Sequence, residues 1–399
     1  MSDLNKELSE YTKNLNKASK DSNINRAITR AVKAYRDTVE DTMERHPHTP
    51  ELAEEVRRIK EYSMENNQQL LEKAMQSIEK NKGKAFYAKD REEALRITNE
   101  IIGTGKTVVK GKSMLGEELQ IRHGLEESGN EVWETDLGEF ILQLKNDRPM
   151  HILSPAIHVP REQVAEIFTE FFKKEIPPDI AQEVAVVREF LREKYFTADV
   201  GISGANVVAA DTGQIVIIEN EGNVRLCTGA PPVHIVLVGI EKLVPSFLDS
   251  MKVAEVTWRY AQYASPSYVN IISGPSKTGD IEKVTTYGAH GPKEFYVIFV
   301  DNGRSEMLKD PTCRQALSCL RCGGCMYECP VFQVTAGHYG RTYLSGIGSV
   351  WTSFVDGGVE EAAPMLYTCL RCGRCVERCP MKIEVPTMVG ELRNRLVSE

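Results

Sequence analysis

The chain has 399 residues, of which 41% are hydrophobic and 27% are charged, and its formal net charge is −8. This length predicts two or three domains, and the negative charge argues against a nucleic-acid-binding surface. No apolar run approaches the roughly 20 residues of a membrane-spanning helix, and the N-terminus lacks the apolar segment of a secretory signal. We therefore expect a globular, cytoplasmic protein without a transmembrane segment.

Residues 1–83 are predicted to form an N-terminal helical arm. Charged and amide residues are frequent here, no glycine occurs before Gly83, and apolar residues recur at helical spacing. The two prolines of His46-Pro-His-Thr-Pro50 mark the end of one helix and the start of another. We expect two or three amphipathic helices, which either cap the main domain or form a docking arm for a partner subunit.

Residues 84–305 are predicted to form an α/β domain. Short runs rich in β-branched and aromatic residues alternate with helical segments, which is typical of βαβ units around a mainly parallel sheet. Helices are expected over residues 91–102 and 115–128. The expected strands are residues 85–88, 107–109, 131–134, 151–153, 207–210, 214–218, 234–238 and 294–300.

Nine of the ten cysteines lie in the remaining segment, residues 306–399. Eight of them form two copies of the pattern C-x2-C-x2-C-x3-C-P, which is the spacing of bacterial-type ferredoxins. In that pattern the first three cysteines hold one cluster and the fourth completes the other. The sequence thus predicts two 4Fe-4S clusters. The expected ligands are Cys319, Cys322, Cys325 and Cys379 for the first cluster, and Cys369, Cys372, Cys375 and Cys329 for the second.

Zinc ribbons and disulfides are the alternatives for these cysteines. Zinc sites usually pair C-x2-C knuckles without a third cysteine or a trailing proline, and a cytosolic protein seldom builds disulfides. The long connector between Cys329 and Cys369 favours an α-helical, ferredoxin-like domain. Cys227 and Cys313 lie outside the pattern and are interpreted as structural thiols without an assigned role.

Polar residues follow several predicted strands of the α/β domain. Lys110 and Lys112 precede a helix and could hold a phosphate or carboxylate. Asn206, Glu219 and Glu221 lie near other strand ends, where open α/β sheets place their ligands; the alternative is that they serve tight turns. No G-x-G-x-x-G motif follows a strand, so no flavin or nicotinamide site is predicted.

The chain resembles the lactate utilisation protein B family over nearly its whole length. The resemblance includes both cysteine motifs and the stretches Val109-Lys-Gly-Lys-Ser-Met114, Glu134-Thr-Asp-Leu-Gly-Glu139, Ala198-Asp-Val-Gly-Ile-Ser-Gly-Ala-Asn206, Asn220-Glu-Gly-Asn-Val-Arg225 and Val300-Asp-Asn-Gly-Arg304. It implies a LUD domain with a sugar-isomerase and CoA-transferase-like α/β fold, followed by a double-cluster ferredoxin domain. It also implies membership of a complex that oxidises lactate to pyruvate.

We therefore expect an iron–sulfur electron-transfer subunit of an oxidoreductase complex, with a lactate-oxidising or flavoprotein subunit as its partner. One alternative is a conduit between an electron-transfer flavoprotein and a membrane quinone reductase, which would place the chain at the inner face of the membrane through its partner. Another is a LUD domain that is catalytic on a small acid, a CoA ester or a phosphorylated ligand. Glu219 or Glu221 would then be the catalytic carboxylate, and Lys110, Lys112 and Asn206 would bind the ligand.

Overall fold

The computed structural model describes residues 2–398, with side chains from residue 8 onward. Its N-terminal helices are α1 (Ser2–Ser19), α2 (Ser22–Arg45), α3 (Thr49–Glu65) and α4 (Asn67–Lys80). The predicted break at the prolines is confirmed, because α2 ends before Pro47 and α3 carries Pro50 in its first turn. The expected number of helices was too low. One reason is Asp21, whose carboxylate accepts hydrogen bonds from the Asn23 and Ile24 amides and so starts a separate helix.

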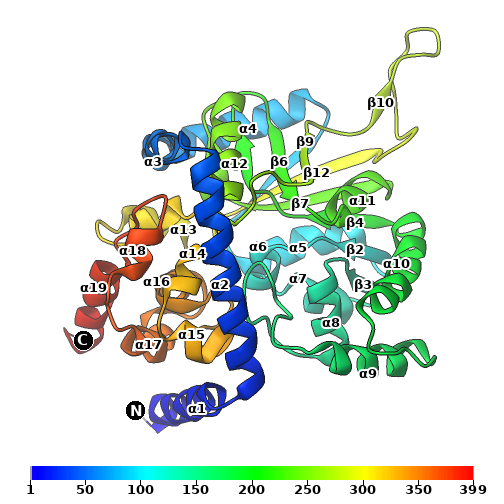
Figure 1. Ribbon diagram of the computed structural model, residues 1–399. Helices are drawn as coiled ribbons and strands as arrows, with labels where there is room; N and C mark the ends of the chain where they lie inside the picture. The colour runs from blue at the N-terminus through cyan, green and yellow to red at the C-terminus, as the bar shows by residue number, and fades with distance from the viewer. Residues whose placement is uncertain (1, 399) are drawn as a thin grey trace.

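Helix α2 crosses the cysteine-bearing part of the molecule (Figure 1). The Tyr35 and Tyr327 rings lie 4.7 Å apart, and Arg36 forms a 2.7 Å salt bridge with Glu328. Helix α3 packs on α12 (Phe247–Tyr260), and α4 packs on β1 (Lys84–Ala88). The arm thus contacts both other parts of the chain. The buried face of α2 consists of Ile24, Ile28, Val32, Tyr35, Val39 and Thr42.

A six-stranded sheet in the order β1-β12-β7-β4-β2-β3 lies at the centre of the α/β domain. All its strand pairs are parallel, as predicted. Side chains of β7 alternate between two apolar clusters: Ile235 and Leu237 belong to one, and Val236 and Val238 belong to the other. Both faces of the sheet are therefore buried. Besides β1, the strands are β2 (Thr107–Lys110), β3 (Glu131–Glu134), β4 (Val200–Ser203), β7 (Val233–Gly239) and β12 (Glu294–Val300).

Two expectations for the α/β domain were wrong. The single helix over residues 115–128 is two helices, because Gln120 adopts a left-handed conformation with φ of 51°. Residues 151–153 form a bend instead of a strand, since Nδ1 of His151 accepts hydrogen bonds from the Leu153 and Ser154 amides. The helices here are α5 (Arg91–Ile102), α6 (Met114–Glu118), α7 (Ile121–Glu127), α8 (Leu137–Lys145), α9 (Arg161–Phe172), α10 (Ile180–Thr197), α11 (Asn223–Gly229) and α12.

A second, mixed sheet in the order β8-β5-β6-β9 lies beside the first. Two of its strands coincide with predicted runs, but its separation from the parallel sheet was not predicted. A turn at Gly213, with φ of 68°, lets β5 and β6 pair in antiparallel fashion. The short pair β10 (Lys277–Thr278) and β11 (Thr286–Tyr287) forms a hairpin that projects from the body (Figure 1). The sheet contains β5 (Val207–Ala209), β6 (Gln214–Glu219), β8 (Leu243–Val244) and β9 (Tyr268–Ile272).

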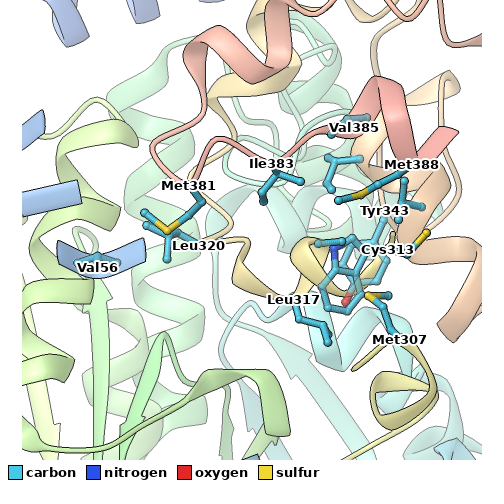
Figure 2. Packing of buried hydrophobic residues seen from close by; sticks show 14 of the residues in the cluster. Val56, Met307, Cys313, Leu317, Leu320, Tyr343, Met381, Ile383, Val385 and Met388 are labelled. Carbon is cyan, nitrogen blue, oxygen red and sulfur yellow. The ribbon is translucent and has the colours of Figure 1, made fainter. Parts of the chain in front are cut away.

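The cysteine-bearing region is helical, as predicted. One apolar core joins it to both the arm and the α/β domain, and Figure 2 shows Leu320 and Met381 together beside Val56 of α3. None of the described helices combines the length and apolar character that crossing a bilayer requires. The helices are α13 (Arg304–Lys309), α14 (Gly324–Glu328), α15 (Phe332–Thr335), α16 (Ser345–Val355), α17 (Gly358–Thr368), α18 (Arg374–Arg378) and α19 (Val385–Ser398).

Candidate metal centres and an adjoining cavity

The two cysteine motifs fold into loops of the same local shape, here called the first loop (residues 319–329) and the second loop (residues 369–379). Arg321 and Arg371 both have positive φ, at 63° and 54°. Gly323 and Gly373 follow with φ of 77° and 82°, and each precedes a five-residue helix, α14 or α18. The sequence repeat is therefore also a structural repeat.

The eight motif cysteines surround two neighbouring hollows. The first hollow is lined by Cys319, Cys322, Cys325, Cys375 and Cys379. The second hollow is lined by Cys325, Cys329, Cys369, Cys372 and Cys375. Each hollow thus contains three cysteines of one loop and the fourth cysteine of the other loop. Cys325 and Cys375 lie between the hollows and line both.

The surroundings of the sulfur atoms suit an iron–sulfur cluster. Backbone amides of the residues that follow Pro330 hydrogen-bond the sulfur of Cys329, and those that follow Pro380 do the same for Cys379. Such amides stabilise the negative charge of a cluster and its thiolates. The donor set, cysteine sulfur alone, is the set that four-iron clusters use.

Burial and the proximity of other thiols raise the pKa of several motif cysteines. Burial, with a smaller contribution from Cys379, raises the pKa of Cys322 to about 12. Burial, with Cys369 as the next cause, raises the pKa of Cys375 to about 12. Thiols with such values lose their protons when a metal binds and replaces them.

No group of three or more His, Cys, Asp or Glu side chains within residues 8–398 surrounds a point that a single metal ion could occupy. A four-iron cluster is larger than one ion, so its ligands stand farther apart, around a hollow. The cysteines of both loops are placed in this way.

The two cysteines outside the motifs line neither hollow. Cys313 is buried in the apolar core beside the first loop. Cys227 is buried in the α/β domain, with its sulfur 3.3 Å from Oγ1 of Thr135. Burial raises the pKa of both thiols to about 12, which makes them poor nucleophiles.

A cavity of about 200 Å³ lies at the carboxyl ends of β2, β4 and β7, the edge where parallel sheets place ligands. Of the ligand-binding residues proposed from the sequence, it brings together Lys112 and Asn206. Ile152, Arg321 and Tyr343 line both this cavity and the first hollow. The cavity and the first cysteine set are therefore separated by a single layer of side chains.

Lys110 does not reach this cavity, because it is held in a buried ion pair. Its Nζ lies 2.9 Å from a carboxylate oxygen of Glu134 and 3.1 Å from one of Glu117. Burial opposes the charge, but these two carboxylates outweigh it and raise the pKa of Lys110. Lys110 and Glu134 are register partners on β2 and β3, which explains the contact.

The two candidate catalytic glutamates also lie outside the cavity lining. Glu219 caps α11, where its carboxylate accepts hydrogen bonds from the Val224 and Arg225 amides at 2.8 and 3.0 Å. Glu221 is exposed and accepts a 3.4 Å hydrogen bond from the Leu137 amide. Desolvation of its carboxylate, followed by the negative charge of Asp136, raises the pKa of Glu221 to about 7, although Lys112 lies near enough to lower it in part. The structure gives Glu219 a structural role and places Glu221 near Lys112 but outside the cavity lining.

A buried charge network beside the cavity was missed in the sequence. The Arg304 guanidinium bonds Glu118 at 2.8 Å and Glu241 at 2.6 Å, and the Tyr343 hydroxyl donates to Glu118. Burial would raise the pKa of Glu241, but the cations around it, Arg304 first, lower it to about 2. The partners are far apart in the chain, so no local pattern predicts their contact. The only signal was charged residues directly after apolar strands.

Residues 71–300 of the chain match the LUD domain, and residues 315–383 match the 4Fe-4S dicluster domain. Proteins named Lactate utilization protein B from Bacillus thuringiensis (strain Al Hakam), Bacillus cereus (strain AH187) and Bacillus anthracis (strain A0248) are each 34% identical over 352 residues. These alignments cover 88% of this chain and 72% of each relative. The crystal structure of a DUF162 family protein from Deinococcus radiodurans aligns with a TM-score of 0.33 and 13% identity, covering 59% of this chain and 98% of that one.

Proposed function

Because the chain belongs to the lactate utilization protein B family, we propose that it is the iron–sulfur electron-transfer subunit of a complex that oxidises lactate to pyruvate. The observation that carries this proposal is the pair of adjoining cysteine-lined hollows, each completed by a cysteine of the other loop. When bound there, two 4Fe-4S clusters would each accept and release one electron.

The proposed ligands are Cys319, Cys322, Cys325 and Cys379 in the first hollow, and Cys329, Cys369, Cys372 and Cys375 in the second. The loop residues hold these thiolates in place and donate amide hydrogen bonds to their sulfurs. Because Cys325 and Cys375 line both hollows, the two sets lie side by side. Buried Trp351 and Tyr343 keep water away from the first set.

The oxidation of lactate removes two electrons and two protons, whereas iron–sulfur clusters exchange electrons singly. A partner subunit, a lactate-oxidising protein or a flavoprotein, would therefore carry out the two-electron step. The second loop is the accessible approach for such a partner, since Cys372 is exposed and Leu370 and Tyr367 keep 65% and 53% of their surface exposed.

Metal analysis of anaerobically reconstituted protein tests this proposal. We expect about eight iron atoms per chain. Cys322→Ser and Cys372→Ser should each remove about half of the iron and alter a different component of the electron paramagnetic resonance spectrum. The matched control is Cys313→Ser, because Cys313 lies in the same region but lines neither hollow. Four irons in the wild-type protein, or equal iron loss in the control, would contradict the assignment.

Growth experiments test the link to lactate. A strain that lacks the gene should fail to grow on lactate and should still grow on pyruvate. The wild-type gene and Cys313→Ser should restore growth, whereas Cys322→Ser and Cys372→Ser should not. Undiminished growth of the deletion strain on lactate as its only carbon source, with no second lactate-oxidising system present, would remove lactate from the proposal.

A further inference from the structure

The cavity between the α/β domain and the first loop contains more positive charge than its own residues neutralise. Its lining includes four cationic side chains and a single carboxylate. Three of the cations are held by carboxylates of the described chain. These pairs are Lys112–Asp136 at 3.1 Å, Arg304–Glu118 at 2.8 Å and Arg321–Glu241 at 3.8 Å.

The fourth cation, Lys242, has no such partner. It follows β7 at the end of a short 3-10 helix, Ile240–Lys242, and its ammonium group makes no hydrogen bond or salt bridge with any residue from 8 to 398. Burial lowers its pKa to about 8. The nearby carboxylate of Glu241 favours its charged form, but that carboxylate is already paired with Arg304 and lies 3.8 Å from Arg321. The half-buried ammonium group of Lys242 therefore has no carboxylate of its own, and the site is suited to an external anion.

A second donor is available in the same lining. Oδ1 of Asn206 accepts a 2.9 Å hydrogen bond from the Ile218 amide, which fixes the orientation of the side chain. Its Nδ2 group donates to no acceptor within the described residues and remains available to a ligand in the cavity. Asn206 was among the binding residues proposed from the sequence, whereas Lys242 was not.

The rest of the lining limits the class of ligand. Much of it is apolar, from Met114, Leu115, Ile152, Val224 and Leu237. The volume of about 200 Å³ is several times the roughly 30 Å³ of one water molecule but below the roughly 300 Å³ at which pockets for drug-sized ligands begin. One free cation and an apolar wall suit a singly charged, short-chain anion, and they suit a phosphate dianion or a dinucleotide poorly.

We propose that this cavity binds a small aliphatic monocarboxylate of two to five carbons, with its carboxylate on Nζ of Lys242 and Nδ2 of Asn206 and its chain against the apolar wall. The site also lies within reach of the first cysteine set, because Arg321 and Tyr343 line both. If the proposed electron-transfer function holds, the negative charge of the bound acid disfavours reduction of the neighbouring cluster.

Calorimetric titration of the anaerobically reconstituted protein tests the site, with L-lactate, pyruvate, propionate and inorganic phosphate as probes. We expect saturable binding of at least one carboxylate and weaker binding of phosphate. Lys242→Met removes a charge-assisted hydrogen bond and should raise the Kd about tenfold or more, and Lys242→Arg should restore part of the affinity. The control is Lys277→Met, since Lys277 is exposed on the projecting hairpin.

Asn206→Asp provides a second variant in case Lys242→Met fails to fold. The aspartate keeps an acceptor for the Ile218 amide but places a negative charge in the cavity, so carboxylate binding should be lost. Tighter binding of phosphate than of every carboxylate would overturn the proposed ligand class. Carboxylate binding that neither Lys242→Met nor Asn206→Asp weakens would overturn the proposed location.

The redox coupling is measured separately, by potentiometric titration with and without the carboxylate that binds. The reduction potential of the first cluster, which is the one lost in Cys322→Ser, should become more negative when the carboxylate binds. The reduction potential of the second cluster should change less. If the protein binds the acid through Lys242 but holds no iron, the proposed electron-transfer function is contradicted and the proposed binding site stands. If the protein holds both clusters but binds no carboxylate, the proposed binding site is contradicted and the electron-transfer function stands.

Discussion

The first and second loops have the same cysteine spacing and nearly the same backbone, but their surroundings differ. Leu320 of the first loop is buried with 6% of its surface exposed, whereas Leu370 at the same place in the second loop keeps 65% exposed. The first loop faces the α/β domain and the cavity, and the second loop carries the exposed Cys372. A repeated local sequence thus yields one shape in two environments.

The arginines within the motifs show the same contrast. The Arg321 guanidinium stacks 3.8 Å from the centre of the Trp351 ring and 4.3 Å from that of Tyr343. Arg371 instead donates a 3.0 Å hydrogen bond to the carbonyl of Pro386 near the surface. The first loop is therefore anchored in the interior, and the second loop is presented to solvent, where a partner can approach.

The strongest test of this comparison removes the buried charge network beside the first loop. Arg304→Met leaves Glu118 and Glu241 buried without their main counter-charge, so we expect a loss of about 3–5 kcal/mol in the free energy of unfolding. Arg371→Met in the second loop should cost about 1 kcal/mol or less, because it removes one partly exposed hydrogen bond. Anaerobic denaturant unfolding measures both. Equal losses would mean that the two loops are anchored equally.

The paired leucines provide a smaller, closely matched test. Leu320→Ala should destabilise the protein by about 2–4 kcal/mol, because it opens a cavity among Val56, Met381 and their neighbours in the apolar core. Leu370→Ala changes a largely exposed side chain and should stay within about 0.5 kcal/mol. Anaerobic denaturant unfolding measures both losses. In the double variant, the loss in the free energy of unfolding should equal the sum of the two single losses. A large loss for Leu370→Ala alone would indicate that the second loop is covered in solution.

The paired glycines should show the smallest difference. Both have positive φ, so an alanine at either position costs about 1–2 kcal/mol of backbone strain. At position 323 the added methyl group would also lie 3.2 Å from Cε1 of His151, whereas at position 373 it meets no atom within 4 Å. We expect Gly323→Ala to lower the melting temperature more than Gly373→Ala. The reverse order would contradict the close packing of His151 on the first loop.

Local features were predicted well because they depend on neighbouring residues. The cysteine spacing indicated two repeated loops, and hydrophobic periodicity placed the helix over residues 91–102, which is α5. It also placed every strand of the parallel sheet except β4, a run of four residues that was not predicted. Turn chemistry was harder to foresee: the left-handed Gln120 and the side-chain hydrogen bonds of His151 changed two elements. The boundaries at 83/84 and 305/306 remain predictions, because one apolar core crosses both.

Side-chain roles in the α/β domain depended on contacts that the linear order does not show. Lys110 and Lys112 look equivalent along the chain, but the register of β2 with β3 places Glu134 beside Lys110 and leaves Lys112 in the cavity lining. Lys242 lies beside Arg321, far along the chain, only because the first loop packs against the end of β7. Short-range spacing was thus sufficient to predict an iron–sulfur protein, whereas long-range packing decided which cysteine loop faces the α/β domain and where a ligand could bind.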